Sequence, residues 1–83
     1  MNQEILAAQG RIANLKLEAK RLALEIEDHR QALKLLTAPL TNPEGYDVER
    51  IPMRATQLAA TVVACRAVQA EIERLRDEYG IAE

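Results

Sequence analysis

The apolar residues in the first half of the chain follow a repeat of seven residues. From Ile5 to Leu36, alternating steps of three and four residues reach ten positions, of which nine are apolar: Ile5, Ala8, Ile12, Leu15, Ala19, Leu22, Ile26, His29, Leu33 and Leu36. No proline interrupts this run, and Pro39 prevents a helix from continuing beyond it. The pattern predicts a long helix over about residues 2–37, with an apolar seam that packs against another helix.

A second apolar stripe lies nearly opposite this seam on the same predicted helix. At 100° per residue its members fall within about 20° of their mean direction: Leu6, Ala13, Leu17, Leu24 and Leu35. One antiparallel partner helix can cover only one of two opposite faces. The stripe therefore either stays in solvent or is covered by another chain.

The second half of the chain predicts another helix, over about residues 52–79. Pro52 suits the first position of a helix, and Gly80 suits a left-handed residue that ends it and brings Ile81 to Leu75. The apolar seam of this helix is Leu58, Val62, Cys65, Val68, Ile72, Leu75 and Tyr79. A second stripe consists of small residues: Ala55, Ala59, Val63, Ala67 and Ala70.

The segment between Arg54 and Arg66 carries no charge on any side. Such a helix is normally buried, and a hairpin of two helices cannot bury it on every side. We therefore expect the chain to pair with itself. The simplest closed arrangement is a two-fold dimer that forms a four-helix bundle, with this segment at its centre. The predicted fold is all-α: residues 1–83 form one antiparallel helical hairpin in a homo-oligomer, most simply a homodimer.

The connection over about residues 38–51 is long for a helical hairpin, which makes it a candidate functional surface. Residues 41–45 predict a turn with Pro43 at its second position. Three apolar residues are expected to fold back over the end of the helix pair: Tyr46, Val48 and Ile51. Tyr46 is interpreted either as a residue tucked into a tethered loop or as part of a binding surface.

Composition narrows the class of protein further. The chain has 83 residues, of which 48% are apolar and only 2% aromatic, so its core must be built from aliphatic residues. The net charge of −2 gives no strong overall attraction to nucleic acid or membrane. We see no signal peptide, and the longest uncharged stretch, Ala55 to Cys65, is shorter than the roughly 20 residues that span a bilayer. We expect a cytoplasmic protein with no membrane association, and its size suits a bacterial or phage accessory protein.

The candidate reactive residues are few. His29 could be a metal ligand or a pH switch, or simply a polar seam residue bonded to Glu25 or to a partner chain. The Glu-x-x-His pattern of di-iron bundles is absent, because Ile26 stands three residues before His29. Cys65 lies in an apolar segment and is expected to be buried. Without serine or a glycine-rich phosphate loop, we expect neither enzymatic activity nor a metal or other cofactor.

Two hypotheses on function remain. The first is a non-enzymatic interaction protein, such as an adaptor, an assembly factor or an inhibitor, which uses apolar helix surface or the loop to bind another protein. Its candidate interaction residues are Leu6, Leu17, Leu24, Tyr46, Leu58, Val62 and Val63. The second is a nucleic-acid-binding dimer that contacts phosphates through the basic residues of the first helix: Arg11, Lys16, Lys20 and Arg21.

Overall fold

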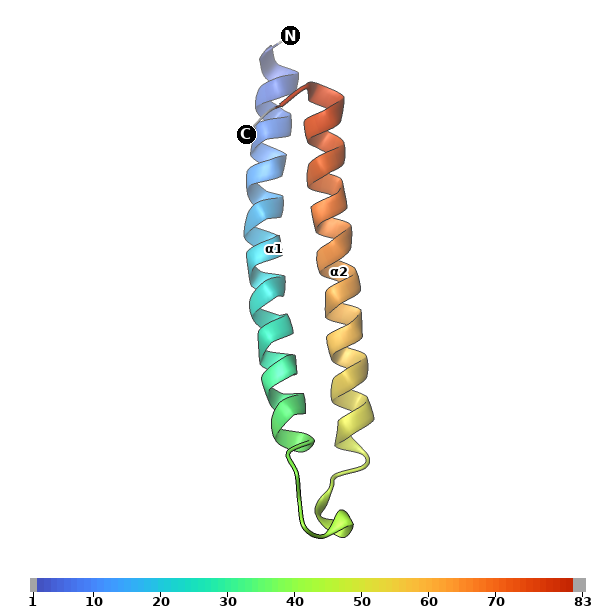
Figure 1. The fold of residues 1–83 in the computed structure, drawn as a ribbon. Coiled ribbons are helices and arrows are strands. Elements are labelled where there is room, and N and C mark those ends of the chain that lie inside the picture. Colours follow the sequence, from blue (N-terminus) through green and yellow to red (C-terminus); the bar gives the residue numbers. More distant parts are fainter. Residues whose placement is uncertain (1, 82–83) are drawn as a thin grey trace.

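The chain forms an antiparallel pair of long helices. The computed structural model describes the backbone of residues 2–81 and the side chains of residues 3–81. Helix α1 (Asn2–Leu36) and helix α2 (Arg50–Tyr79) run side by side, and a loop with one 3-10 turn, η1 (Pro43–Gly45), joins them at one end (Figure 1). The rod measures 66 × 15 × 14 Å. The predicted all-α hairpin is confirmed, and no strand occurs within residues 2–81.

The core is a narrow strip between the two helices. Among the described side chains, the buried apolar ones are Ala8, Ile12, Leu15, Leu22, Cys65, Ile72 and Leu75. Every one of them belongs to a predicted heptad seam, and the other seam positions are half-buried except Ile5, which is exposed near the end of α1. The seven-residue repeat thus identified the packed face of both helices, because residues three and four apart lie on one side of a helix.

The sequence predicts that helix α2 starts at Pro52, but the helix begins before that residue. Asp47 caps the first turn: its Oδ1 accepts the backbone N–H groups of Glu49 at 3.2 Å and of Arg50 at 3.0 Å. Its carbonyl oxygen accepts the N–H of Ile51 at 3.1 Å. Aspartate is a strong N-cap residue, so the helical turn forms from Asp47 onward and Pro52 lies inside it.

The opposite end of α2 follows the prediction. Gly80 has φ of 63°, in the left-handed region that favours glycine. The backbone N–H of Ile81 then donates to the carbonyl oxygen of Arg76 at 2.9 Å, as in a Schellman motif. Ile81 packs against the core cluster that contains Leu75 and Ile72. This cap holds the last described residue of the chain against the helix pair.

The loop closes on itself through Tyr46. The backbone N–H of Leu40 donates to the Oη of Tyr46 at 2.8 Å. The predicted turn is confirmed, since the N–H of Gly45 donates to the carbonyl oxygen of Asn42 at 3.0 Å. The prediction for Val48 is wrong: its side chain is 74% exposed. The turn that Asp47 starts places Val48 on the outer side of the hairpin, so it covers nothing.

Candidate interaction surfaces

The outer side of α1 carries a row of leucines that the hairpin does not cover. Their exposed fractions are 62% for Leu6, 66% for Leu17, 69% for Leu24 and 77% for Leu35. With Ala13, which is also exposed, they form the predicted second stripe, which we call the outer leucine stripe. The stripe stays exposed because it lies opposite the seam and the hairpin supplies only one partner helix.

The outer side of α2 differs from that of α1 in the size of its apolar residues. Val63 is 64% exposed, whereas its neighbours on that side are mostly small residues: Ala59, Ala60, Ala64 and Ala67. Two further predicted interaction residues, Leu58 and Val62, are half-buried in the seam against α1. The exposed large aliphatic surface of the two helices is therefore concentrated on α1.

The total exposed surface is large for a chain of this size. The chain exposes 6318 Å². A compact monomer of 9.3 kDa is expected to expose about 5,000 Å². The excess of about 1,300 Å² exceeds the roughly 800 Å² that each partner loses in a standard protein–protein interface. A single hairpin thus leaves enough surface uncovered for a full interface.

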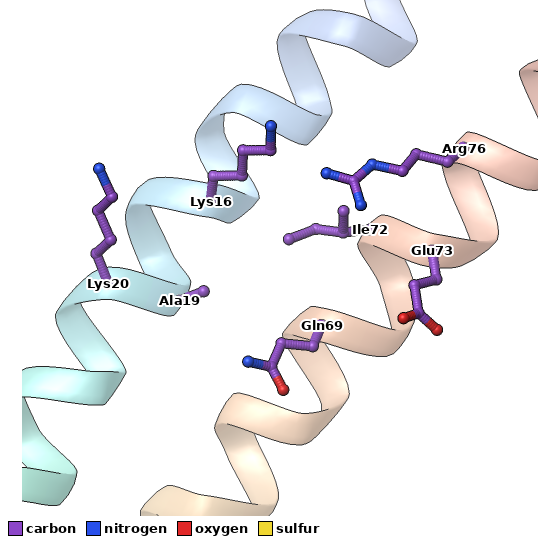
Figure 2. A pocket seen from close by; sticks show the side chains of 7 residues that line it. All are labelled: Lys16, Ala19, Lys20, Gln69, Ile72, Glu73 and Arg76. Atoms are coloured by element: carbon purple, nitrogen blue, oxygen red, sulfur yellow. The ribbon is translucent and has the colours of Figure 1, made fainter. Parts of the chain in front are cut away.

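A groove between the helices is lined by cationic side chains from both of them. Its volume is about 390 Å³. We call it the cationic groove, and its lining residues are Lys16, Ala19, Lys20, Gln69, Ile72, Glu73 and Arg76. Figure 2 shows the Arg76 guanidinium reaching from α2 toward α1, while Lys20 extends away from α2. Three cations and one carboxylate share this side of the rod, which gives it a local positive bias.

The four predicted basic residues do not form one surface. Lys16 and Lys20 line the cationic groove, but Arg21 lies between two carboxylates of its own helix. It donates to Glu18, and its Nη1 lies 2.6 Å from Oε1 of Glu25. The hydrogen bond from Arg21 lowers the pKa of Glu18. Local ion pairs along α1 therefore neutralise part of the predicted basic face.

Arg11 does not line the cationic groove. Its positive charge acts on Glu71 of α2, whose pKa is lowered mainly by a hydrogen bond from Arg74 and to a smaller extent by Arg11. At 100° per residue, Arg11 and Lys16 point to different sides of the seam. Sequence reasoning did not include Arg76 in this group, because only the pairing of α1 with α2 brings it to Lys16.

A second groove lies at the loop end of the hairpin. It has a volume of about 410 Å³, and its lining residues are Ala32, Leu35, Leu36, Arg50, Met53 and Arg54. Arg50 forms an ion pair with Asp47 at 3.6 Å. We call this the loop-end groove. It combines apolar walls with two guanidinium groups, and it is continuous with the outer leucine stripe through Leu35.

His29 of α1 is hydrogen-bonded to a residue of α2. Nη1 of Arg54 lies 3.0 Å from Nδ1 of His29. Of the two expected partners of His29, Glu25 and a residue of another chain, Glu25 instead accepts a hydrogen bond from Arg21. Cys65 is buried in the seam, with Sγ 4.0 Å from the carbonyl oxygen of Ala19. Within residues 2–81, no group of three or more His, Cys, Asp and Glu side chains is placed to hold a metal ion.

Comparison with known proteins adds no relative. No protein-family model matches the chain, and neither a curated protein nor a solved structure matches it. In the described part of the chain, neither α1 nor α2 contains an apolar stretch that could cross a bilayer. The features that bear on function are therefore the outer leucine stripe, the two grooves and the closed loop.

Proposed function

We propose that this chain is a small interaction protein that works as a self-associated bundle of helical hairpins. In this role it acts as an adaptor, an assembly factor or an inhibitor rather than as an enzyme. The outer leucine stripe of α1 is the observation that supports the proposal most directly. Four leucines in one row, each more than 60% exposed, are more apolar surface than isolated exposed residues account for.

The small core also supports self-association. The buried side chains form one strip between two helices, and domains of this size gain little stability from a single small core. Covering the outer leucine stripe with another chain would bury further apolar surface at roughly 25 cal/mol per Å². Self-association would then leave the Tyr46 loop as a surface for another protein.

The test is the solution mass of the protein, measured by light scattering over a dilution series. We expect a dimer or a higher oligomer that dissociates on dilution. The double variant Leu17→Glu, Leu24→Glu should be a monomer, because it places charges within the outer leucine stripe. Circular dichroism of the variant should still report a helical protein. A wild-type chain that is monomeric at every concentration would refute the proposal.

A second function is supported by the cationic groove. Lys16, Lys20 and Arg76 come from two helices to one side of the rod, so phosphates of a nucleic acid are a candidate ligand there. Fluorescence anisotropy with labelled RNA and DNA at low salt tests this function. We expect Lys16→Gln, Lys20→Gln to weaken any binding, and Arg21→Gln to weaken it less. Absence of binding at low salt, where phosphate contacts are strongest, would exclude this function.

A further inference from the structure

We infer that the self-association proposed above occurs through α1: the helix packs antiparallel against α1 of a second copy, about a two-fold axis between Lys20 and Arg21. This inference rests on the proposed function and specifies its surface and geometry. Its occupant is a second copy of the same chain, and its contact residues are the four exposed leucines.

The spacing of the leucines is symmetric. Leu6 and Leu17 are separated by eleven residues, Leu17 and Leu24 by seven, and Leu24 and Leu35 by eleven. A two-fold interface is self-complementary, so that if one residue contacts a second, the second contacts the first in the other copy. An antiparallel pair centred between residues 20 and 21 places Leu17 opposite Leu24, and Leu6 opposite Leu35. Every exposed leucine of α1 then meets a leucine.

The helix is suited to such a contact in length and direction. Eleven residues are about three turns and seven about two, so all four leucines stay on one side of α1. The proposed axis lies near the middle of Asn2–Leu36, and the two copies of α1 therefore overlap along nearly their whole length. At 1.5 Å per residue, the leucines from Leu6 to Leu35 span roughly 44 Å.

The charged residues beside the stripe favour this register. On one flank, Lys16 lies at nearly the same position along the helix axis as Glu27 of the second copy. The two-fold symmetry produces the same pair a second time. On the other flank, Asn14 comes opposite Asp28 of the second copy. A competing antiparallel register, with Leu6 opposite Leu24, brings Lys16 against Lys16 of the second copy, as the proposed register does for Lys20. Like charges are unfavourable in both registers, but only the proposed one also brings a carboxylate, Glu27, close to a lysine on that flank.

The loop-end groove supports the same arrangement. Leu35 is one of its walls, and Met53, another wall, is 53% exposed. Leu6 of the second copy, placed against Leu35, reaches the edge of this groove and covers apolar surface that one hairpin leaves in solvent. The order of helices across the dimer becomes α2, α1, α1, α2. The uncharged segment of α2 then lies at the outer edges, not at the centre where the sequence placed it.

Disulfide trapping tests the register. The background is Cys65→Ala, in which Leu17→Cys and Leu24→Cys are made as two separate proteins, one of them with an affinity tag. After mixing and mild oxidation, we expect a disulfide between the two different proteins. Each protein oxidised alone should not form it. In a dimer of one single-cysteine protein, the two cysteines are offset by seven residues along the helix axis, or roughly 10 Å, whereas a disulfide needs Cα atoms about 4.4–6.8 Å apart.

The other outcomes each contradict the inference in a different way. A disulfide in Leu17→Cys alone indicates parallel helices or a two-fold axis at residue 17, and one between Leu6→Cys and Leu24→Cys indicates the competing register. A dimer by light scattering with no trapped disulfide indicates another face. In these three cases self-association survives and the α1 geometry does not. A monomer by light scattering removes both.

A matched pair of variants gives a second measurement. Leu24→Glu and Val63→Glu introduce the same charge at side chains of similar exposure, 69% and 64%, on the outer sides of α1 and α2. Leu24→Glu should shift the dimer toward monomer by at least tenfold in dissociation constant. Val63→Glu should leave it within about twofold of the wild type. The reverse order would place the interface on α2 and overturn the inference.

Discussion

Arg54 of α2 donates a hydrogen bond from Nη1 to Nδ1 of His29 on α1, over 3.0 Å. Because a guanidinium is always protonated and carries no acceptor, Nδ1 of the imidazole must be the acceptor and the ring proton lies on Nε2. His29 is the one polar residue in the α1 seam. The bond satisfies it across the two helices, and a polar seam residue with a single partner fixes the register of the pair.

Replacing His29 by leucine is expected to stabilise the hairpin. The position is half-buried in an otherwise aliphatic seam, and Arg54 is partly exposed, so its guanidinium can turn to water. We expect a gain of about 1 kcal/mol from apolar burial. Urea unfolding followed by circular dichroism at one fixed protein concentration measures this, because association also shifts apparent stability. A loss of stability in His29→Leu would mean that the bond to Arg54 outweighs the apolar gain.

The heptad repeats made the packed faces predictable, because helical geometry alone decides which residues share a side. Leu15 and Ile72 could be assigned to the core without knowing the register of the pair. The groove between Lys16 and Arg76 could not be found in this way. These residues are far apart in the sequence, and only the register between α1 and α2 brings them together.

The start of α2 was missed for a different reason. Pro52 is a strong local signal, but a capping carboxylate five residues earlier, at Asp47, determines where the first turn begins. The basic residues of α1 were also judged by sequence proximity. In the structure Arg21 is paired with Glu18 and Glu25, which lie three residues before it and four residues after it. Local ion pairs on a helix can therefore remove charge that a count of basic residues suggests is available.

Removing the cap of α2 should destabilise the hairpin measurably. In Asp47→Ala the N–H groups of Glu49 and Arg50 lose their acceptor, and loss of an N-cap typically costs about 1 kcal/mol. Glu49→Ala is the matched control, since the Glu49 side chain makes no capping hydrogen bond. Thermal unfolding should show a lower midpoint for Asp47→Ala and little change for Glu49→Ala. Equal effects of the two variants would contradict the role of Asp47.

Tyr46→Phe should open the loop without unfolding the helices. The variant removes the hydroxyl that accepts the N–H of Leu40 at 2.8 Å. Because the net contribution of one such bond is about 1 kcal/mol, we expect the Leu40 amide to exchange with solvent roughly five-fold faster. Hydrogen exchange measured by NMR gives this rate. The Gly45 amide, which donates to Asn42, is an internal control and should keep its protection. An unchanged Leu40 rate would mean that the hydroxyl does not hold the loop.

Acid should weaken α1 in a defined range of pH. Hydrogen bonds from Arg30 and then Gln31 lower the pKa of Glu27 from its ordinary value near 4.5 to about 2. A carboxyl group whose pKa is lower in the folded state stabilises that state above its unfolded pKa. This contribution is complete above about pH 4.5 and is lost as the pH falls toward 2.

The variant Glu27→Gln tests this dependence. Its free energy of unfolding, measured by urea titration from pH 6 to 2, should fall less than that of the wild type. Because the pair is exposed, 1 M NaCl should reduce the difference. If wild type and variant lose stability in parallel through the whole range, Glu27 makes no pH-dependent contribution.

Lys20 weakens the proposed dimer by charge repulsion, and its replacement should tighten association. In the register with the two-fold axis between Lys20 and Arg21, the ammonium groups of the two copies of Lys20 approach one another. Two like charges about 4 Å apart in water repel by about 1 kcal/mol. Lys20→Leu removes this repulsion and extends the apolar stripe between Leu17 and Leu24. We expect the dissociation constant of the dimer to fall about tenfold, which corresponds to about 1.4 kcal/mol.

Sedimentation equilibrium at low and high salt gives both constants. High salt screens the lysines, so the advantage of Lys20→Leu over the wild type should shrink as salt rises. Lys34→Leu is a suitable control, because Lys34 is also an exposed lysine of α1 but lies away from the proposed axis. If Lys20→Leu leaves the dissociation constant unchanged at low salt, the two copies do not meet near residue 20. The axis would then have to be placed elsewhere on α1 or on another face.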